Sequence, residues 1–166
     1  MRRIVSDTGP LISLEKLRGG YDFIRVLFDE IIVPPRVLEE LAHSLFDPAS
    51  LYLHHYNIVD LITVQKTSGV QKEFTSARLH EAEIQAMSLA LDQDLPLLIE
   101  ETEGRRVAQE LGLHISGIAG QILRAFREDF IDKSFAQRLL RELLEAGRIN
   151  KKIYDSLDEA LQTNSF

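Results

Sequence analysis

The sequence contains no cysteine and no apolar run near the roughly 20 residues that are needed to cross a bilayer. Without cysteine, disulfide bonds, thiolate metal sites and a cysteine nucleophile are excluded, so any metal ion must be held by oxygen or imidazole. The segment before Asp7 has too little apolar length for a secretion signal. We therefore expect a cytoplasmic protein with no membrane contact.

Basic residues are also in deficit, since 19 Lys and Arg stand against 26 Asp and Glu, which gives a formal net charge of -7 at pH 7. This balance counts against a nucleic-acid binder, which usually gains affinity from basic surface. Carboxylates gathered around divalent cations would answer the objection, because bound ions reverse the charge locally while Arg and Lys at the rim contact phosphates. The net charge would then describe only the metal-free chain.

Short apolar segments alternate with helical patterns along the chain. We expect strands at residues 3–6, 31–33, 58–64, 95–99 and 114–116, and leave the rest of 46–75 unassigned. We expect helices at residues 11–17, 21–28, 35–43, 77–92, 104–111, 118–130, 134–146 and 150–161. This order is typical of an α/β fold in which helices cover both faces of a parallel sheet.

Acidic residues follow two of the expected strands. Asp7 comes directly after the first strand, and Glu100 and Glu101 come after the strand at 95–99. Ligands of open parallel sheets bind beyond the carboxyl ends of the strands, so these acids are candidates for a site. Asp7 alone would more simply be a cap for the helix that follows it.

A third acid lies on a helix face that packs against the sheet. Glu83 is in line with Ala86, Met87 and Ala90, whereas Glu81 lies about 200° around the helix, on the side expected to face solvent. In the helix after Pro35, Glu39 and Glu40 fall on either side of the apolar face, so the pattern barely separates them.

Several carboxylates on buried faces would repel one another unless a hard cation such as Mg²⁺ or Mn²⁺ held them ionised. The alternative is that each reaches solvent or pairs with Arg105 or Arg106. Zinc is not expected, because no two of the five histidines stand four residues apart with a carboxylate between them. The pattern alone leaves these alternatives open.

Four segments of the sequence resemble the PIN domains, including toxins of the VapC type. They are IVSDTGPLI at residues 4–12, VPPRVLEEL at 33–41, EAEIQAMSLAL at 81–91 and LLIEE at 97–101. The resemblance extends from Arg3 to about Phe126. It implies a three-layer α/β/α fold, with a nuclease domain over residues 1–130 and additional C-terminal helices over residues 131–166 packed on the same domain.

By position, the family's four acids fall on Asp7, Glu40, Glu83 and Glu101, with Glu100 next to the fourth and the small hydroxyl on Thr8. The resemblance implies that these acids hold one or two Mg²⁺ or Mn²⁺ ions and that the protein hydrolyses RNA. Glu stands where the third and fourth acids are usually Asp, which affects the coordination geometry. Candidates for phosphate contacts are Arg105, Arg106 and Lys16.

The resemblance also implies a small antitoxin partner and a homodimer. We expect the partner surface on the last two helices, whose apolar positions include Leu139, Leu140, Leu143, Leu144, Ile153, Leu157 and Leu161. Packing of these residues within their own domain is an equal alternative.

The residues argue against two other enzyme or signalling classes that would also place an Asp after the first strand, and they leave one rival function open. An aspartyl phosphohydrolase would need a second Asp two residues after Asp7, where the chain has Gly9, and a phospho-receiver domain would need an acid pair and an acceptor Asp that the sequence does not offer. The alternative that is not primarily enzymatic is a PIN-like protein with weak catalytic activity that serves mainly to bind another protein.

Overall fold

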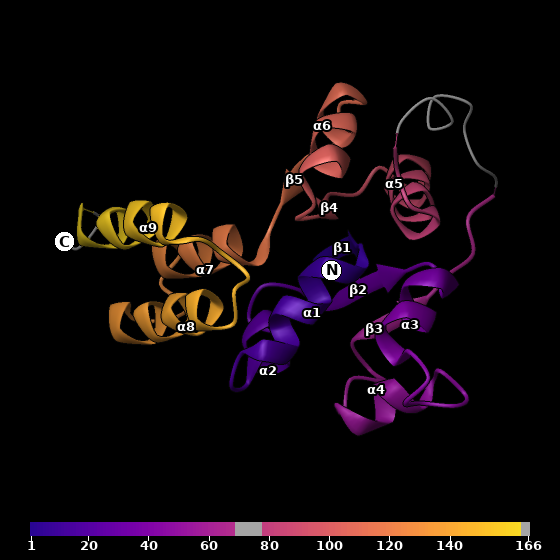
Figure 1. Ribbon diagram of the computed structural model, residues 1–166, viewed down its shortest axis with the longest axis horizontal. Coiled ribbons are helices and arrows are strands. Elements are labelled where there is room, and N and C mark those ends of the chain that lie inside the picture. The colour runs from indigo at the N-terminus through magenta and orange to yellow at the C-terminus, as the bar shows by residue number, and fades with distance from the viewer. Residues whose placement is uncertain (69–77, 164–166) are drawn as a thin grey trace. The chain divides into compact units, whose positions relative to one another are not determined.

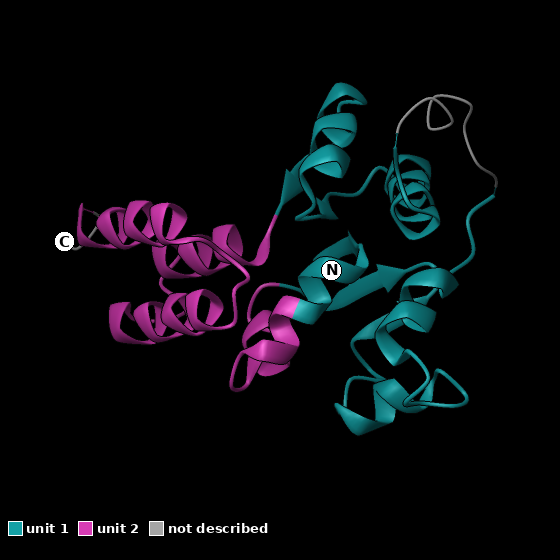
Figure 2. Ribbon diagram, in the orientation of Figure 1, with its two compact units in different colours: residues 1–12, 28–116 teal, residues 13–27, 117–166 magenta. Residues whose placement is uncertain are grey.

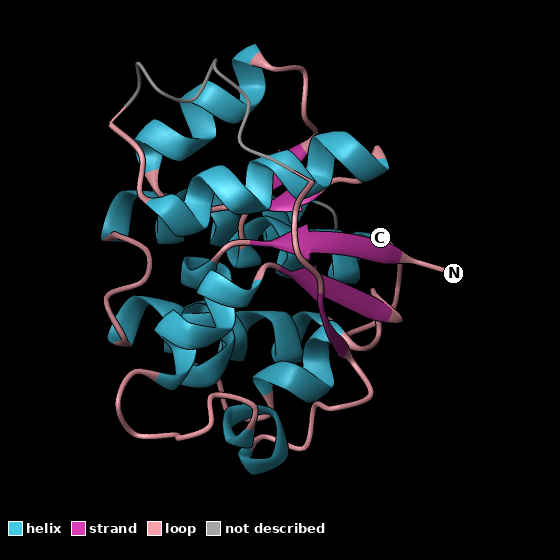
Figure 3. Cartoon of the chain, turned by 90° about the vertical axis from the view of Figure 1, so that its right-hand side faces the viewer, coloured by secondary structure: helices cyan, strands magenta, loops and turns pink. Residues whose placement is uncertain are grey.

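The computed structural model describes residues 1–68 and 78–163 and contains a five-stranded parallel sheet in the order β3-β2-β1-β4-β5. Figure 3 shows the strands side by side. The strands are β1 (Arg3–Ser6), β2 (Glu30–Val33), β3 (Ile62–Val64), β4 (Leu97–Leu98) and β5 (Ile115–Ser116). Strand residues such as Ile4, Ile32 and Leu97 are at most 1% exposed. This is expected where helices cover a parallel sheet on both faces, so the predicted α/β class is confirmed.

Helices connect and follow the strands (Figure 1). They are α1 (Thr8–Lys16), α2 (Gly20–Ile24), α3 (Pro35–Ala42), α4 (Leu51–His55), α5 (Glu81–Gln93), α6 (Thr102–Glu110), α7 (Ile118–Arg127), α8 (Lys133–Glu145) and α9 (Lys151–Thr163). In residues 1–68 and 78–163, none of them has the length and apolar character of a membrane span.

The chain changes direction across the sheet at β1. From β1 it builds outward through β2 to β3, and it then returns to the other side of β1 to form β4 and β5. The carboxyl ends of β1 and β4 therefore lie side by side, with Ser6 in register with Leu98. Such a switch point is where parallel sheets bind ligands.

The chain forms two compact units, which Figure 2 distinguishes by colour. Unit 1 comprises residues 1–12 and 28–116, and unit 2 comprises residues 13–27 and 117–166. The core of unit 1 includes Val5, Ile32, Met87 and Leu97, contributed by the sheet and by α5. The division into a nuclease domain over residues 1–130 and an extension over residues 131–166 stays a prediction.

In unit 2, helices α7, α8 and α9 pack on one another. Leu139, Leu140, Leu143 and Leu161 are at most 1% exposed. These four leucines therefore belong to the core of their own unit, and the expectation that they offer a partner surface is wrong for them. Each helix buries a single apolar stripe, and these leucines form the stripes by which α8 and α9 pack against the neighbouring helices of unit 2.

The predicted element order agrees with the structure, with differences at element ends and in one segment. The expected strand at 58–64 is reduced to β3, and the short helix α4 lies in the segment without a prediction. The helix expected from Ala77 begins at Glu81; Ala77 itself lies outside the described residues. The strand expected at 95–99 is reduced to the two residues of β4.

Candidate active site

Asp7 is held at the switch point by the backbone. Its N–H donates to the carbonyl of Leu98, at 3.0 Å, which links the end of β1 to the end of β4. Asp7 is only 5% exposed, and its Oδ1 atom is buried without a hydrogen-bond partner. Because α1 begins at Thr8, Asp7 also occupies the position of a helix cap. A cap role alone leaves the buried Oδ1 atom unexplained.

Glu83 lies on the buried face of α5, as its spacing predicts. It is 5% exposed, next to the buried residues Ala82, Ala86 and Met87, and its Oε2 atom has no hydrogen-bond partner. Glu81, on the other side of the helix, is exposed, so the predicted order of exposure is confirmed. An ionised carboxylate in such surroundings requires compensation that the neighbouring apolar side chains cannot give.

Glu40 is tied to the start of α1 by Thr8. The Thr8 hydroxyl donates a 2.7 Å hydrogen bond to Oε2 of Glu40, and the Nε atom of Arg36 lies 4.0 Å from Oε1. The side chain of Glu40 is 37% exposed and that of Glu39 is 60% exposed, so this predicted order is also confirmed. Thr8 thus fixes the orientation of the second acid.

Glu101 stands at the N-terminus of α6, where its Oε2 atom accepts a 2.7 Å hydrogen bond from the N–H of Gly104. The same arrangement brings it close to Glu83: a Cβ added to Gly104 would lie 3.1 Å from Oε2 of Glu83 and 3.4 Å from Oε2 of Glu101. Glu101 is among the charges that raise the pKa of Asp7 and of Glu83. The geometry thus favours Glu101 as the fourth acid.

The four acids influence one another electrostatically. Burial raises the pKa of Asp7 to about 6; an N–H from Thr8 opposes the shift, and Glu40 and Glu101 add to it. Burial also raises the pKa of Glu83 to about 7, with further contributions from Asp7, Glu101 and Glu40. The structure therefore brings Asp7, Glu40, Glu83 and Glu101 into one cluster, which we call the acid cluster.

The acid cluster has the donor chemistry of a site for a hard divalent cation. Its oxygens are the ligands that such ions prefer, and two of them, on Asp7 and Glu83, are buried without partners. Gly104 has no side chain and so lets Glu83 and Glu101 approach its backbone closely. Among residues 1–68 and 78–163, no three Asp, Glu or His side chains are already closed into a ligand set. The four acids therefore suit such an ion by the chemistry of their oxygens, and not by a ligand geometry that is already formed.

His80 is not among the residues that the sequence indicates. It precedes α5, is exposed, and its charge lowers the pKa of Asp7. The spacing of the histidines argues against a zinc site and gives no information about a role for His80 near Asp7. The one available signal is the place of His80 immediately before the segment that carries Glu81 and Glu83.

The candidate phosphate-binding residues have contacts of their own. Arg106 is paired with Glu103 and Glu110 along α6, and Nη1 of Arg105 donates to the carbonyl of Ile99, at 2.9 Å. Lys16, the last residue of α1, is exposed and belongs to unit 2. Phosphate contacts by these three residues stay a prediction.

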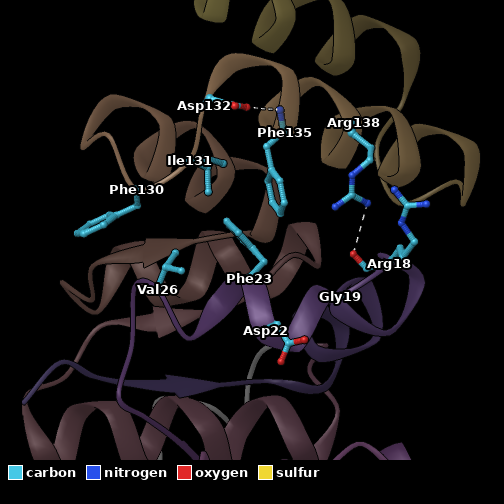
Figure 4. A pocket seen from close by; sticks show the side chains of 10 residues that line it. All are labelled: Arg18, Gly19, Asp22, Phe23, Val26, Phe130, Ile131, Asp132, Phe135 and Arg138. Carbon is cyan, nitrogen blue, oxygen red and sulfur yellow. Dashed lines mark hydrogen bonds between the residues drawn. The ribbon is translucent and has the colours of Figure 1, made fainter.

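Unit 2 has a hollow of its own, of about 520 Å³ (Figure 4). Phe23, Phe130 and Phe135 line it together with Arg18 and Arg138. None of the four acids contributes to its walls. The chemistry of the acid cluster therefore does not extend into this hollow.

Comparison with known proteins gives a match over most of the chain. The family DUF3368, described as a PIN domain, matches residues 3–162, which include the C-terminal helices. No curated protein matches the sequence.

Two solved structures are similar in fold. One is a PilT N-terminus domain protein from the hyperthermophilic archaeon Sulfolobus solfataricus P2, with 14% identity and a TM-score of 0.46, covering 71% of this chain and 87% of that chain. The other is a domain of a functionally unknown protein from Methanocaldococcus jannaschii DSM 2661, with 16% identity and a TM-score of 0.43, covering 70% of this chain and 91% of that chain. The assignment to a family rests on the match over residues 3–162.

Proposed function

Because this chain belongs to the PIN-domain family, we propose that it is a metal-dependent endoribonuclease that hydrolyses phosphodiester bonds of RNA. PIN domains are generally nucleases and typically use divalent metal ions. The observation that carries the proposal is the pair of buried, unpartnered carboxylate oxygens on Asp7 and Glu83, next to two further acids. Such a pair has no structural use that we can identify.

In this proposal, Asp7, Glu40, Glu83 and Glu101 hold Mg²⁺ or Mn²⁺. When bound, the ion supplies Lewis-acid chemistry, which makes water a stronger nucleophile and neutralises charge on the departing oxygen. The chain itself supplies the fixed geometry. Thr8 orients Glu40 through its 2.7 Å hydrogen bond, and Gly104 orients Glu101 through its N–H while allowing Glu83 to lie close to the backbone of α6.

The toxin role and the partners are part of the same proposal. A nuclease that cuts cellular RNA must be restrained, and we propose a small antitoxin protein and a homodimer. The exposed apolar side chains Phe130, Phe135 and Ile153 of unit 2 support a contact with another chain. Light scattering and co-purification from the native host test both associations; a monomer that brings no partner would contradict them.

A cleavage assay on single-stranded RNA tests the enzymatic proposal. We expect the purified protein to cut when Mg²⁺ or Mn²⁺ is present, to stop with excess chelator, and to resume when the metal is restored. A parallel assay on single-stranded DNA determines whether the substrate class is RNA alone. A protein that binds a partner chain but cuts no RNA with either metal would instead be a PIN-like binding module.

A further inference from the structure

A hollow of about 390 Å³ lies between α3, α5 and the chain that follows β3, and we call it the α3–α5 hollow. Its walls include six polar side chains, those of Arg36, Glu39, Lys66, Thr67, Glu81 and Gln85. All of them belong to unit 1. Its volume is within the range of sites that bind small organic groups.

The α3–α5 hollow adjoins the acid cluster. Arg36 lines the hollow, and its Nε atom lies 4.0 Å from Oε1 of Glu40. On α5, Glu81 and Glu83 face opposite sides of the helix, so the hollow meets the acid cluster along α3, through Arg36 and Glu40. In an RNA whose scissile phosphate is at the acid cluster, a neighbouring nucleotide would therefore reach the hollow.

The hollow combines two kinds of polar group. Glu39 and Glu81 contribute carboxylates, which only accept hydrogen bonds when ionised. Gln85 donates to Oε1 of Glu81, at 3.1 Å, and so helps to orient that carboxylate. Arg36 and Lys66 contribute cations, which suit the phosphate of the same nucleotide.

Acceptors of this kind discriminate between bases. Guanine presents two adjacent N–H donors on its Watson–Crick edge, which one carboxylate can accept together. Uracil presents a single N–H between two carbonyl oxygens, and these oxygens would face the carboxylate unfavourably. Bases in single-stranded RNA are accessible on this edge.

We infer that the α3–α5 hollow binds a nucleotide next to the scissile phosphate, that Glu39 and Glu81 select guanine there, and that Arg36 and Lys66 bind its phosphate. This inference rests on the proposed ribonuclease function and names the substrate preference of the same site. It assigns a role to charged residues that the acid cluster does not use.

Binding measurements test the inference without relying on cleavage. The parent is the Asp7→Asn protein in magnesium, and the probes are two fluorescent single-stranded RNAs that differ only in carrying guanine or uracil. We expect the guanine RNA to bind about tenfold more tightly, within the range of a good bidentate base contact. The pair of substitutions Glu39→Gln and Glu81→Gln should remove that ratio, whereas Glu110→Gln, on the exposed side of α6, should keep it.

The cations are tested in the same assay. Lys66→Ala should weaken binding of both RNAs and flatten the dependence of affinity on salt, because fewer counterions are released. Arg36→Ala should do the same, and Lys66→Ala repeats the test without disturbing Glu40. Arg2→Ala is the control, since Arg2 precedes β1 and therefore lies at the opposite end of this strand from Asp7.

Equal affinity for the two RNAs, or a guanine preference that survives the paired Gln substitutions, would overturn the inference. Unchanged affinity in both Arg36→Ala and Lys66→Ala would show that RNA does not lie in the hollow. These binding results are distinguishable from a failure of the proposed ribonuclease function. If that function is wrong, the unsubstituted protein will cut no RNA in Mg²⁺ or Mn²⁺, whatever base it prefers in the binding assay.

Discussion

Gly104 lies so close to Glu83 that a Cβ at position 104 would approach Oε2 of Glu83 to 3.1 Å. The same Cβ would lie 2.6 Å from Cδ1 of Ile99, a fully buried side chain. A glycine inside a helix normally costs stability, roughly 1 kcal/mol relative to alanine. Its presence in α6 is explained by the close approach of Ile99, Glu83 and Glu101, which a side chain at this position would obstruct.

Gly104→Ala should therefore be destabilising in spite of the better helix former. Overpacking of this kind costs about 1–3 kcal/mol, which exceeds the gain in helix propensity. Metal affinity should fall as well, because the methyl group occupies space next to Glu83 and Glu101. Gly120→Ala is the matched control: Gly120 is in α7, a Cβ there would meet no atom within 4 Å, and stability should rise slightly. Thermal unfolding with and without Mn²⁺ measures both effects, and equal behaviour of the two variants would contradict this account of Gly104.

Stability of the metal-free protein should fall as the pH rises toward neutrality. The pKa values of Asp7 and Glu83 are raised to about 6 and about 7 in the folded state, so folding favours their protonated forms. Their contribution is complete below about pH 4, near the unfolded values, and is lost as the pH passes through about 6 to 7. Other groups titrate too, so the measurement is the difference between the native protein and Asp7→Asn in urea unfolding across pH 4 to 8.

In that comparison, Asp7→Asn should gain stability relative to the native protein as the pH rises. Saturating Mn²⁺ should reverse the order at neutral pH, because the ion stabilises the native protein more strongly. A difference that does not change with pH would show that Asp7 does not titrate with a raised pKa.

Thr8→Val should reduce activity by releasing Glu40. The substitution removes the hydroxyl that donates to Oε2 of Glu40 and retains a similar shape. The cost in stability should be modest, about 1 kcal/mol, as for a single hydrogen bond, whereas RNA cleavage should fall more than unfolding can explain. Thr8→Ser keeps the donor and should restore most of the cleavage rate. If Ser and Val behave alike, the hydroxyl does not position Glu40.

Glu101→Gln and Glu100→Gln separate two adjacent acids. Glu101 raises the pKa of Asp7 and of Glu83, and its Oε2 atom accepts a hydrogen bond from the N–H of Gly104, which lies close to Glu83. We expect Glu101→Gln to weaken Mn²⁺ binding in calorimetry by at least about tenfold, since a carboxylate ligand is replaced by a weaker amide ligand. Glu100→Gln should bind Mn²⁺ nearly as the native protein does. The opposite ranking would assign the fourth ligand to Glu100.

The site could be predicted from the sequence where helical periodicity decides the outcome. The apolar line of Ala86, Met87 and Ala90 is enough to place Glu83 on a buried face, and the structure agrees. Periodicity could not separate Glu39 from Glu40, since both flank the apolar face of α3. That choice depends on the resemblance, and its physical basis is the hydroxyl of Thr8, which is distant in the sequence.

Other features depend on contacts that no local pattern reveals. Glu101 is distinguished from Glu100 by its hydrogen bond to the N–H of Gly104, which is made only once α6 has formed. His80 carries no spacing signal, and its relation to Asp7 arises from the packing of α5 on the sheet. The helix α4 could not be predicted because its five residues are too few to establish a period.

The central claim is that Asp7 holds a divalent cation for RNA cleavage, and the Asp7→Asn protein tests it most directly. The amide retains the size of the side chain and its ability to cap α1, but it loses the charge that binds a hard cation. Asp7→Ala provides the comparison: if Asp7 were only a cap, Ala would lose roughly 1 kcal/mol of stability and cleave RNA normally.

The measurement is the rate of single-stranded RNA cleavage in Mg²⁺ and in Mn²⁺, with the folded fraction checked by thermal unfolding. We predict that Asp7→Asn remains folded while its cleavage rate falls by orders of magnitude. Cleavage by Asp7→Asn at the rate of the native protein, with the same dependence on metal, would contradict the claim.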